Sequence, residues 1–338
     1  MSNSKNRTGF GLARRAKALL NRGETALTLR KLARQKREIA ALQRVLARRE
    51  AGEEVGIRPE NVVWVFGSGR TGSSWLTFMM GGLPDHTRWN EPLIGYLFGH
   101  LYYERGWTRQ DAKHFILGDD YEETWLDSIR SLVLNSGLAR FPERAENGYL
   151  VIKEPHGSMG APLLVKALPE SRMIFLIRDP RAVAASNLDA HRQGSRPSQR
   201  RRTKRSELFE KKTQADERPD AYVRSHARTY LQDIRFTKQA YEAHKGRKVL
   251  IRYEDLRADT LGTMKRIYST LEIPVDEAEL ARVIEKHAWE NIPEDEKGPG
   301  KIRRKASTKG WKEDLTPEQV EIVERENAEI LDQFYAED

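Results

Sequence analysis

The chain has 338 residues, of which 38% are hydrophobic and 32% charged, and its formal net charge is +9. This length suits one large α/β domain with an appendage or two modest domains, and the charge favours anionic partners such as nucleotides, sulfated or phosphorylated molecules, nucleic acid or anionic lipid. The lack of cysteine excludes disulfides, a thiolate nucleophile and a cysteine-ligated zinc site. No apolar run is long enough to span a bilayer and no signal-peptide core is present, so we expect a cytoplasmic enzyme.

Residues 1–52 differ from the rest of the chain because they are rich in Arg, Lys, Ala and Leu, with only three acidic residues. Leu32, Ile39, Leu42 and Leu46 recur at helical spacing, which predicts an amphipathic helix over residues 25–49. Such a basic helix can pair with another helix or lie on an anionic membrane. We expect this basic helical arm to serve self-association or docking first, contact with a membrane surface second and nucleic acid third.

Residues 51–60 read as a linker into a buried strand at 61–66, followed by a glycine-rich loop at 67–72 and a helix from Ser73. This order surrounds one point with backbone N–H groups and the positive end of a helix dipole, which is how such loops hold phosphate. The spacing of Gly67 and Gly72 nearly fits the P-loop pattern, but Ser73 replaces the expected lysine and Arg70 supplies the cation from inside the loop. This departure counts against a nucleoside triphosphatase.

Three further buried strands are predicted at residues 149–153, 172–178 and 248–253, and helices separate them. This alternation predicts a single P-loop-like α/β domain over residues 60–338, with a central parallel sheet flanked by helices. Ligands of such sheets bind outside the carboxyl ends of the strands. Arg70, Lys153, Arg178 and Tyr253 all fall at these ends.

Between the strands, helices are predicted at residues 121–138, 161–168, 181–187, 221–241 and 260–271, and in part of 93–114. Glu91 lies on a short segment soon after the loop helix, and the sequence predicts no strand in this segment. A last helix should begin after Thr316, because Thr316, Pro317 and Gln319 form an N-cap, a first-turn proline and a capping box.

Residues 190–218 form a basic insertion that we expect to be mobile, because it has few apolar anchors. Arg200, Arg201, Arg202, Lys204 and Arg205 are almost consecutive within it. A charge run of this kind is usually just solvated, but beside an anion-binding edge it could cover or recruit an acidic substrate. A second basic segment occupies residues 301–312.

Taken together, these motifs resemble the sulfotransferases that use 3′-phosphoadenosine 5′-phosphosulfate (PAPS), from about Val62 to the last helix. GSGRTGSSW resembles the 5′-phosphosulfate loop, IRDPRAVAASN the 3′-phosphate motif, IRYEDL the YED segment and RRKASTKGWK the C-terminal R-K-G-x-x-G-D-W-K segment. In the last of these, Ala306 and Lys309 stand where the family has glycines. The resemblance implies that the 5′-phosphosulfate is held by Arg70, Thr71, Gly72, Ser73 and Ser74, adenine by Trp75 and Tyr253, and the 3′-phosphate by Arg178, Ser186, Arg304 and Lys305.

The resemblance to the arginine-loop branch of the family also implies catalytic roles. Glu91 would be the general base that accepts the acceptor proton, and Lys153 and Arg70 would stabilise the transferring group. His156 is the rival base, because the cytosolic branch uses a histidine just after the corresponding strand. No metal is needed if these cations and the loop amides neutralise the charge.

The predicted function is transfer of the sulfuryl group from PAPS to a hydroxyl or amine, giving 3′,5′-ADP. The acceptor is open, with a slight preference for an acidic glycan or lipid because of the basic surroundings. A nucleotide-dependent kinase or phosphotransferase is the alternative, and it would need a loop lysine and an acidic Mg²⁺ ligand. A basic nucleic-acid-binding protein is less favoured still, since the basic runs carry no interleaved aromatics.

Overall fold

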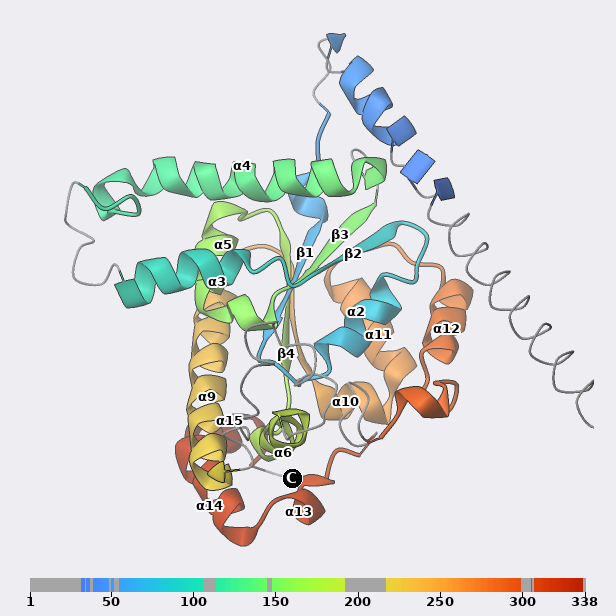
Figure 1. Ribbon diagram of the computed structural model, residues 1–338. Helices are drawn as coiled ribbons and strands as arrows, with labels where there is room; N and C mark the ends of the chain where they lie inside the picture. Colours follow the sequence, from blue (N-terminus) through green and yellow to red (C-terminus); the bar gives the residue numbers. More distant parts are fainter. Residues whose placement is uncertain are drawn as a thin grey trace, which may run out of the picture.

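The structure is a computed structural model in which the described residues are 32–33, 35–36, 39–48, 50–51, 55–105, 114–144, 148–191, 217–298, 305 and 307–336 (Figure 1). Within them, a five-stranded sheet has the order β2-β3-β1-β4-β5, and every pairing is parallel. The strands are β1 (Val62–Gly67), β2 (His86–Asn90), β3 (Tyr149–Lys153), β4 (Arg172–Ile177) and β5 (Lys248–Arg252). The predicted α/β class and parallel sheet are therefore confirmed.

The central strands β1 and β4 are buried along their whole length. Helices cover both faces of the sheet, which explains why these strands read as continuous apolar runs rather than alternating ones. On one face α4 (Glu122–Arg140), α5 (Ala161–Ala167) and α9 (Pro219–Ala243) pack near Trp64 and Phe175. On the other face α2 (Ser73–Met80), α11 (Thr260–Thr270) and α12 (Glu277–Lys286) pack near Val63 and Leu176 (Figure 1).

Strand β2 corrects the sequence prediction, which assigned no strand there. Its sequence HTRWN is mostly polar, and only His86 and Trp89 are buried, because β2 is an edge strand. It pairs with β3 so that Asn90 lies opposite Lys153. Glu91 consequently follows the last residue of β2. Lys153 is the last residue of β3, and Arg178 follows the last residue of β4.

The predicted helices form with small shifts of their ends. The prediction at 93–114 corresponds to α3 (Ile94–Gly99) and a π-helical turn at His100–Arg105, and residues 106–113 lie outside the described residues. The prediction at 181–187 corresponds to α6 (Pro180–His191), and Tyr253 begins α10 (Tyr253–Ala258) instead of ending a strand. Elements that were not predicted include α12 (Glu277–Lys286), α13 (Trp311–Asp314) and 3-10 turns such as Pro59–Asn61 and η5 (Pro155–Gly160).

The capping box at the last predicted helix is present. The Gln319 N–H donates to Thr316 Oγ1 at 3.3 Å, and the Thr316 N–H donates to Gln319 Oε1 at 3.2 Å. The helix that follows is α14 (Pro317–Glu326), and α15 (Ala328–Phe334) continues after a break at Asn327. The cap therefore marks the start of the helix as predicted, but not its end.

Part of the basic arm is described, and residues 39–48 are helical. Ala41 and Val45 are buried, whereas Ile39, Leu42 and Leu46 remain exposed. The basic insertion falls almost wholly at residues 192–216, which lie outside the described residues, as does Arg304. Among the helices that the structure describes, none combines the length and apolarity that a bilayer crossing requires.

Candidate active site

A cavity opens at the carboxyl ends of the strands and gathers most of the predicted site residues. Those that line it are Arg70, Gly72, Ser73, Ser74, Trp75, Glu91, Lys153, His156, Arg178, Ser186, Tyr253 and Lys305. They come from segments as far apart as the first strand and the C-terminal region. The parallel sheet brings them together because the carboxyl ends of its strands share one edge.

The glycine loop between β1 and α2 depends on two glycines with positive φ. Gly67 has φ 148° and Gly72 has φ 89°. A Cβ on Gly72 would overlap the Tyr253 ring, and one on Gly67 would overlap the Leu176 carbonyl. The loop therefore packs directly on β4 and α10, which leaves the N-terminus of α2, with Ser73 and Ser74, facing the cavity.

Thr71 differs from the other predicted loop residues because its side chain does not line the cavity. It is fully buried, and its hydroxyl donates to the Ser68 carbonyl at 2.8 Å. The Ser68 hydroxyl in turn donates to Asp233 Oδ2 on α9 at 2.7 Å. The side chains of Thr71 and Ser68 thus stabilise the loop conformation from the side that faces away from the cavity.

Arg70 connects two parts of the cavity. It adopts φ 68°, which is uncommon for a residue other than glycine. Its Nε donates to the Ser186 hydroxyl on α6 at 2.9 Å. The residue predicted for the 5′-phosphosulfate therefore contacts one predicted for the 3′-phosphate, and the two groups of residues adjoin.

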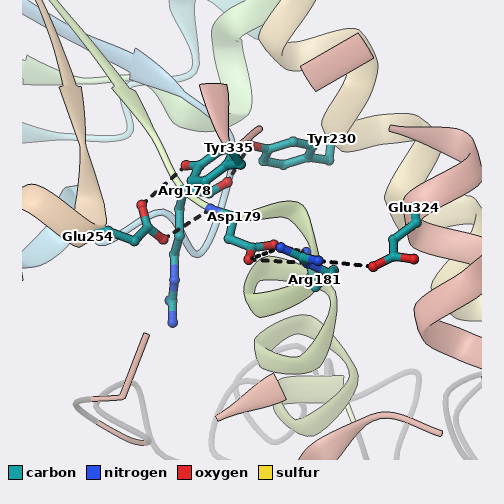
Figure 2. Close-up of polar contacts among 7 residues, drawn as sticks. All are labelled: Arg178, Asp179, Arg181, Tyr230, Glu254, Glu324 and Tyr335. Atoms are coloured by element: carbon teal, nitrogen blue, oxygen red, sulfur yellow. Dashed lines mark hydrogen bonds and ion pairs between the residues drawn. The ribbon is translucent and has the colours of Figure 1, made fainter. Parts of the chain in front are cut away.

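Arg178, directly after β4, is buried and held by its surroundings. Its Nη1 donates to the Arg70 carbonyl at 3.0 Å, and its guanidinium lies 4.3 Å from the centroid of the Tyr253 ring. Two hydrogen bonds fix its peptide: Tyr230 Oη donates to the Arg178 carbonyl at 2.5 Å, and the Asp179 N–H donates to Glu254 Oε1 at 3.1 Å. Figure 2 shows the Arg178 side chain extending away from this network.

The hydrogen-bond network behind Arg178 extends to helices much later in the chain. Tyr335 Oη donates to Glu254 Oε2 at 3.2 Å, and Arg181 bridges Asp179 and Glu324 (Figure 2). Burial raises the pKa of the Glu254 carboxyl. The peptide that carries Arg178 is thereby tied to α9, α10, α14 and the residue after α15.

Glu91 and Lys153 form an ion pair at the other side of the cavity. Burial would raise the pKa of the Glu91 carboxyl, but Lys153, His156 and Arg88 together outweigh it and leave that pKa lowered. Burial also lowers the pKa of the Lys153 ammonium, and the opposing effect of Glu91 does not cancel this shift. Glu91 is therefore ionised at neutral pH, and the Lys153 proton is held less tightly than usual.

His156 lies beside the same pair and stays largely exposed. It is close enough to the loop that a Cβ on Gly69 would come within 3.0 Å of its ring. Both candidate bases thus lie at one end of the cavity.

Several lining residues, most of them aromatic or basic, were not predicted from the sequence: Phe78, Arg257, His287, Trp289 and Ile292. The Trp75 indole N–H donates to the His287 carbonyl at 3.0 Å, and Arg257 lies 5.4 Å from the centroid of the Trp75 ring. They belong to α2, α10 and the segment after α12, where no motif marks them. Apart from Ile292 they are aromatic or basic, and that character is the one signal in the sequence that could have marked them.

Lys305 reaches the cavity while its Nζ also donates to Asp314 Oδ1 at 2.9 Å. Its neighbours Arg304 and Ala306 lie outside the described residues. Among the residues that the structure describes, no three His, Asp or Glu side chains are grouped so that they could share a metal ion.

Comparison with known proteins gives a family and a set of similar folds. A model of the sulfotransferase family matches residues 63–277. A search of curated protein sequences gives no match. Similar solved structures include a mouse sulfotransferase complexed with PAP (14% identity, covering 81% of this chain and 85% of that one, TM-score 0.48) and a sulfotransferase from Mycobacterium avium (16%, 82% and 78%, 0.46). Another is retinol dehydratase in complex with androsterone and inactive cofactor PAP (17%, 81% and 81%, 0.38).

Proposed function

The chain belongs to the sulfotransferase family, and from that membership we propose that it transfers the sulfuryl group of PAPS to a hydroxyl or amine and releases 3′,5′-ADP. One observation carries the proposal: Arg70, Lys153, Arg178 and Lys305 line a single cavity with the aromatic Trp75. PAPS needs this combination, because its ribose carries anionic groups at both the 3′ and 5′ positions and an adenine ring at the 1′ position.

Two adjoining parts of the cavity suit the two anionic groups of the donor. Arg178 and Ser186 would hold the 3′-phosphate, with Lys305 and the predicted Arg304 beside them. The loop amides, Ser73 and Ser74 at the start of α2 would hold the 5′-phosphosulfate. Thr71 would contribute through its backbone, since its hydroxyl is engaged with the Ser68 carbonyl. Trp75, Tyr253 and the newly located Trp289 would bind the adenine ring.

Glu91 is proposed as the general base and Lys153 as the group that stabilises the transferring sulfuryl oxygens. In the structure these two residues neutralise each other. When the sulfuryl group arrives, the Lys153 ammonium can turn to its oxygens, which frees the Glu91 carboxylate to accept the acceptor proton. The new bond forms between the acceptor oxygen or nitrogen and sulfur, while the bond from sulfur to the bridging oxygen breaks and that oxygen takes the charge.

Calorimetric titration tests the donor assignment. We expect 3′,5′-ADP to bind without Mg²⁺, and Arg178→Ala to weaken binding by at least tenfold, because a charge-assisted contact to phosphate is lost. ATP with Mg²⁺ serves as the comparison ligand. Preferential binding of ATP–Mg²⁺ with indifference to the 3′-phosphate would instead support the nucleotide-dependent kinase alternative.

We also propose a class of acceptor, a role for the basic arm and a location for the protein. An acidic glycan or lipid is favoured by the net charge of +9. The exposed Ile39, Leu42 and Leu46 support a role of the arm in self-association or in contact with an anionic membrane. Sedimentation with anionic vesicles and light scattering of the free protein would separate these two roles. We propose a cytoplasmic location, at a membrane surface in the second case.

A further inference from the structure

The turn that carries Glu91 has an unusual backbone. Glu91 has φ 49° and Leu93 has φ 62°, and Pro92 lies between them. Positive φ is uncommon for residues with a Cβ, and the following proline restricts Glu91 further. Conformations of this kind are strained and persist only where the surroundings hold them. Something near the turn must therefore hold it.

Glu154 occupies the position from which this turn can be held. It directly follows Lys153 and is fully buried. Its Oε1 accepts a hydrogen bond from the Ile94 N–H at 3.0 Å, at the start of α3. Its own N–H donates to the Val65 carbonyl at 3.0 Å, which anchors it to the central strand β1. The side chain thus links the rigid centre of the sheet to the residue just beyond the strained turn.

The absence of a side chain at Gly157 leaves room for this carboxyl. A Cβ on Gly157 would overlap Glu154 Oε2. Among the described residues, Oε2 has no hydrogen-bond partner. A buried polar atom left this way is costly, so a leucine of similar size would be expected here if packing were the only requirement.

The electrostatic surroundings agree with a supporting role. Burial raises the pKa of the Glu154 carboxyl to about 7, and the nearby Glu91 charge raises it too, while the Ile94 and Leu93 N–H groups and Lys153 lower it. A carboxyl that is partly neutral near pH 7 adds little repulsion against Glu91. It can therefore lie behind the Glu91–Lys153 pair without breaking it.

From this geometry, and resting on the function proposed above, we propose that Glu154 is a positioning residue for Glu91. It holds the 91–93 turn in its left-handed conformation by accepting the Ile94 N–H. The turn then directs the Glu91 carboxylate onto Lys153 inside the cavity. Glu154 itself does not line the cavity, and so acts through Glu91.

Crystal structures of the full chain with 3′,5′-ADP bound, as wild type, Glu154→Gln and Glu154→Leu, test this directly. Gln keeps an oxygen for the Ile94 N–H, so Glu91 should retain its positive φ and its contact with Lys153. Leu removes the acceptor, so the turn should relax and that contact should be lost. Glu154→Asp, which withdraws the acceptor by one methylene, should have the same effect as Leu and serves if the Leu variant does not fold. An unchanged Glu91 in the Leu or Asp variant would overturn the proposal.

Kinetics with PAPS and p-nitrophenol as the probe acceptor give a second readout. We expect Leu to lower kcat at least tenfold while KM for PAPS changes less than twofold, and Gln to stay within threefold of wild type. In a Glu91→Gln background the Leu substitution should add almost nothing, because both act on one group. Parallel losses of kcat and donor affinity would mean a general structural role and contradict the proposal.

The matched control is Asp233→Asn, which alters a different buried acid and should leave Glu91 where it is. Failure of the proposed function would look different from failure of this inference. In the first case the wild-type chain would not bind 3′,5′-ADP at all. In the second, binding would be intact and Glu91 would keep its conformation without the Glu154 carboxyl.

Discussion

At the scale of single residues, the two candidate bases differ in their electrostatic surroundings. Glu91 is paired with a buried lysine and its pKa is lowered, whereas His156 is exposed beside the same pair. A base that is always ionised at neutral pH gives a rate that changes little between pH 6 and 8, while a histidine base gives one that rises as the imidazole loses its proton. The two assignments therefore predict different pH profiles.

We expect Glu91→Gln to lower kcat by at least 100-fold with little change in KM for PAPS, because the proton acceptor is removed and the donor contacts remain. His156→Gln should lower kcat less than tenfold. Steady-state kinetics from pH 6 to 8 measure both, with 2-naphthol as the acceptor because its own hydroxyl stays protonated over this range. Near-normal turnover of Glu91→Gln, together with loss of activity in His156→Gln, would assign the base to His156.

Asp233 gives a prediction about stability. Burial raises its pKa to about 7, against the lowering effect of the Ser68 hydrogen bond. An acid whose pKa is higher in the folded state contributes stability below its unfolded pKa, near 4, and loses that contribution as the pH rises to about 7. Asp233→Asn keeps an oxygen for Ser68 and cannot ionise. The variant should therefore melt above the wild type at pH 8, by roughly 2–4 °C for each kcal/mol, and this gain should shrink at pH 5. An equal difference at both pH values would contradict this view.

At the scale of elements, the glycine loop depends on its contact with α10. A side chain at residue 72 would meet the Tyr253 ring and would need φ 89°. We expect Gly72→Ala to destabilise the fold by about 1–3 kcal/mol and to weaken 3′,5′-ADP binding at least tenfold. Thermal melting and calorimetry measure the two effects.

Gly56→Ala is the control for this prediction, because no described atom lies within 4 Å of a Cβ built there. It should melt within about 2 °C of wild type, as surface substitutions usually do. If Gly72→Ala behaved like Gly56→Ala, the loop would not be packed on Tyr253 in the way the structure describes.

The elements also show which features a sequence can reveal. Strands β1, β3 and β4 are apolar runs and were predicted to within a residue, and the Thr316 capping box marked a helix start. β2 was missed because an edge strand with only two buried residues shows no apolar run. Phe78, Trp289 and Ile292 were missed because their place in the cavity depends on how α2 and α12 pack, which no local pattern encodes. Likewise, the burial of the Thr71 hydroxyl follows from the fold of the loop and not from its motif.

At the scale of the whole molecule, charge should dominate donor binding. Arg70, Lys153, Arg178, Arg257 and Lys305 meet at one cavity in a chain of net charge +9. Raising the salt from 0.05 to 0.5 M should weaken 3′,5′-ADP binding about tenfold, because salt screens the partly exposed cations. Adenosine, which has no charge, should be affected less than twofold. An equal loss for both ligands in calorimetry would show that the cations contribute little.

The order of the strands fixes the separation between Glu91 and Arg178. Glu91 follows β2 and Arg178 follows β4, and the sequence β2-β3-β1-β4 puts three strand spacings between them. At about 4.8 Å per spacing this amounts to about 14 Å, fixed by backbone hydrogen bonds that no ligand can stretch. The sheet therefore fixes how far the proposed base lies from the proposed 3′-phosphate site. A donor bound at Arg178 has to reach across β1 and β3 if its sulfuryl group is to lie beside Glu91 and Lys153.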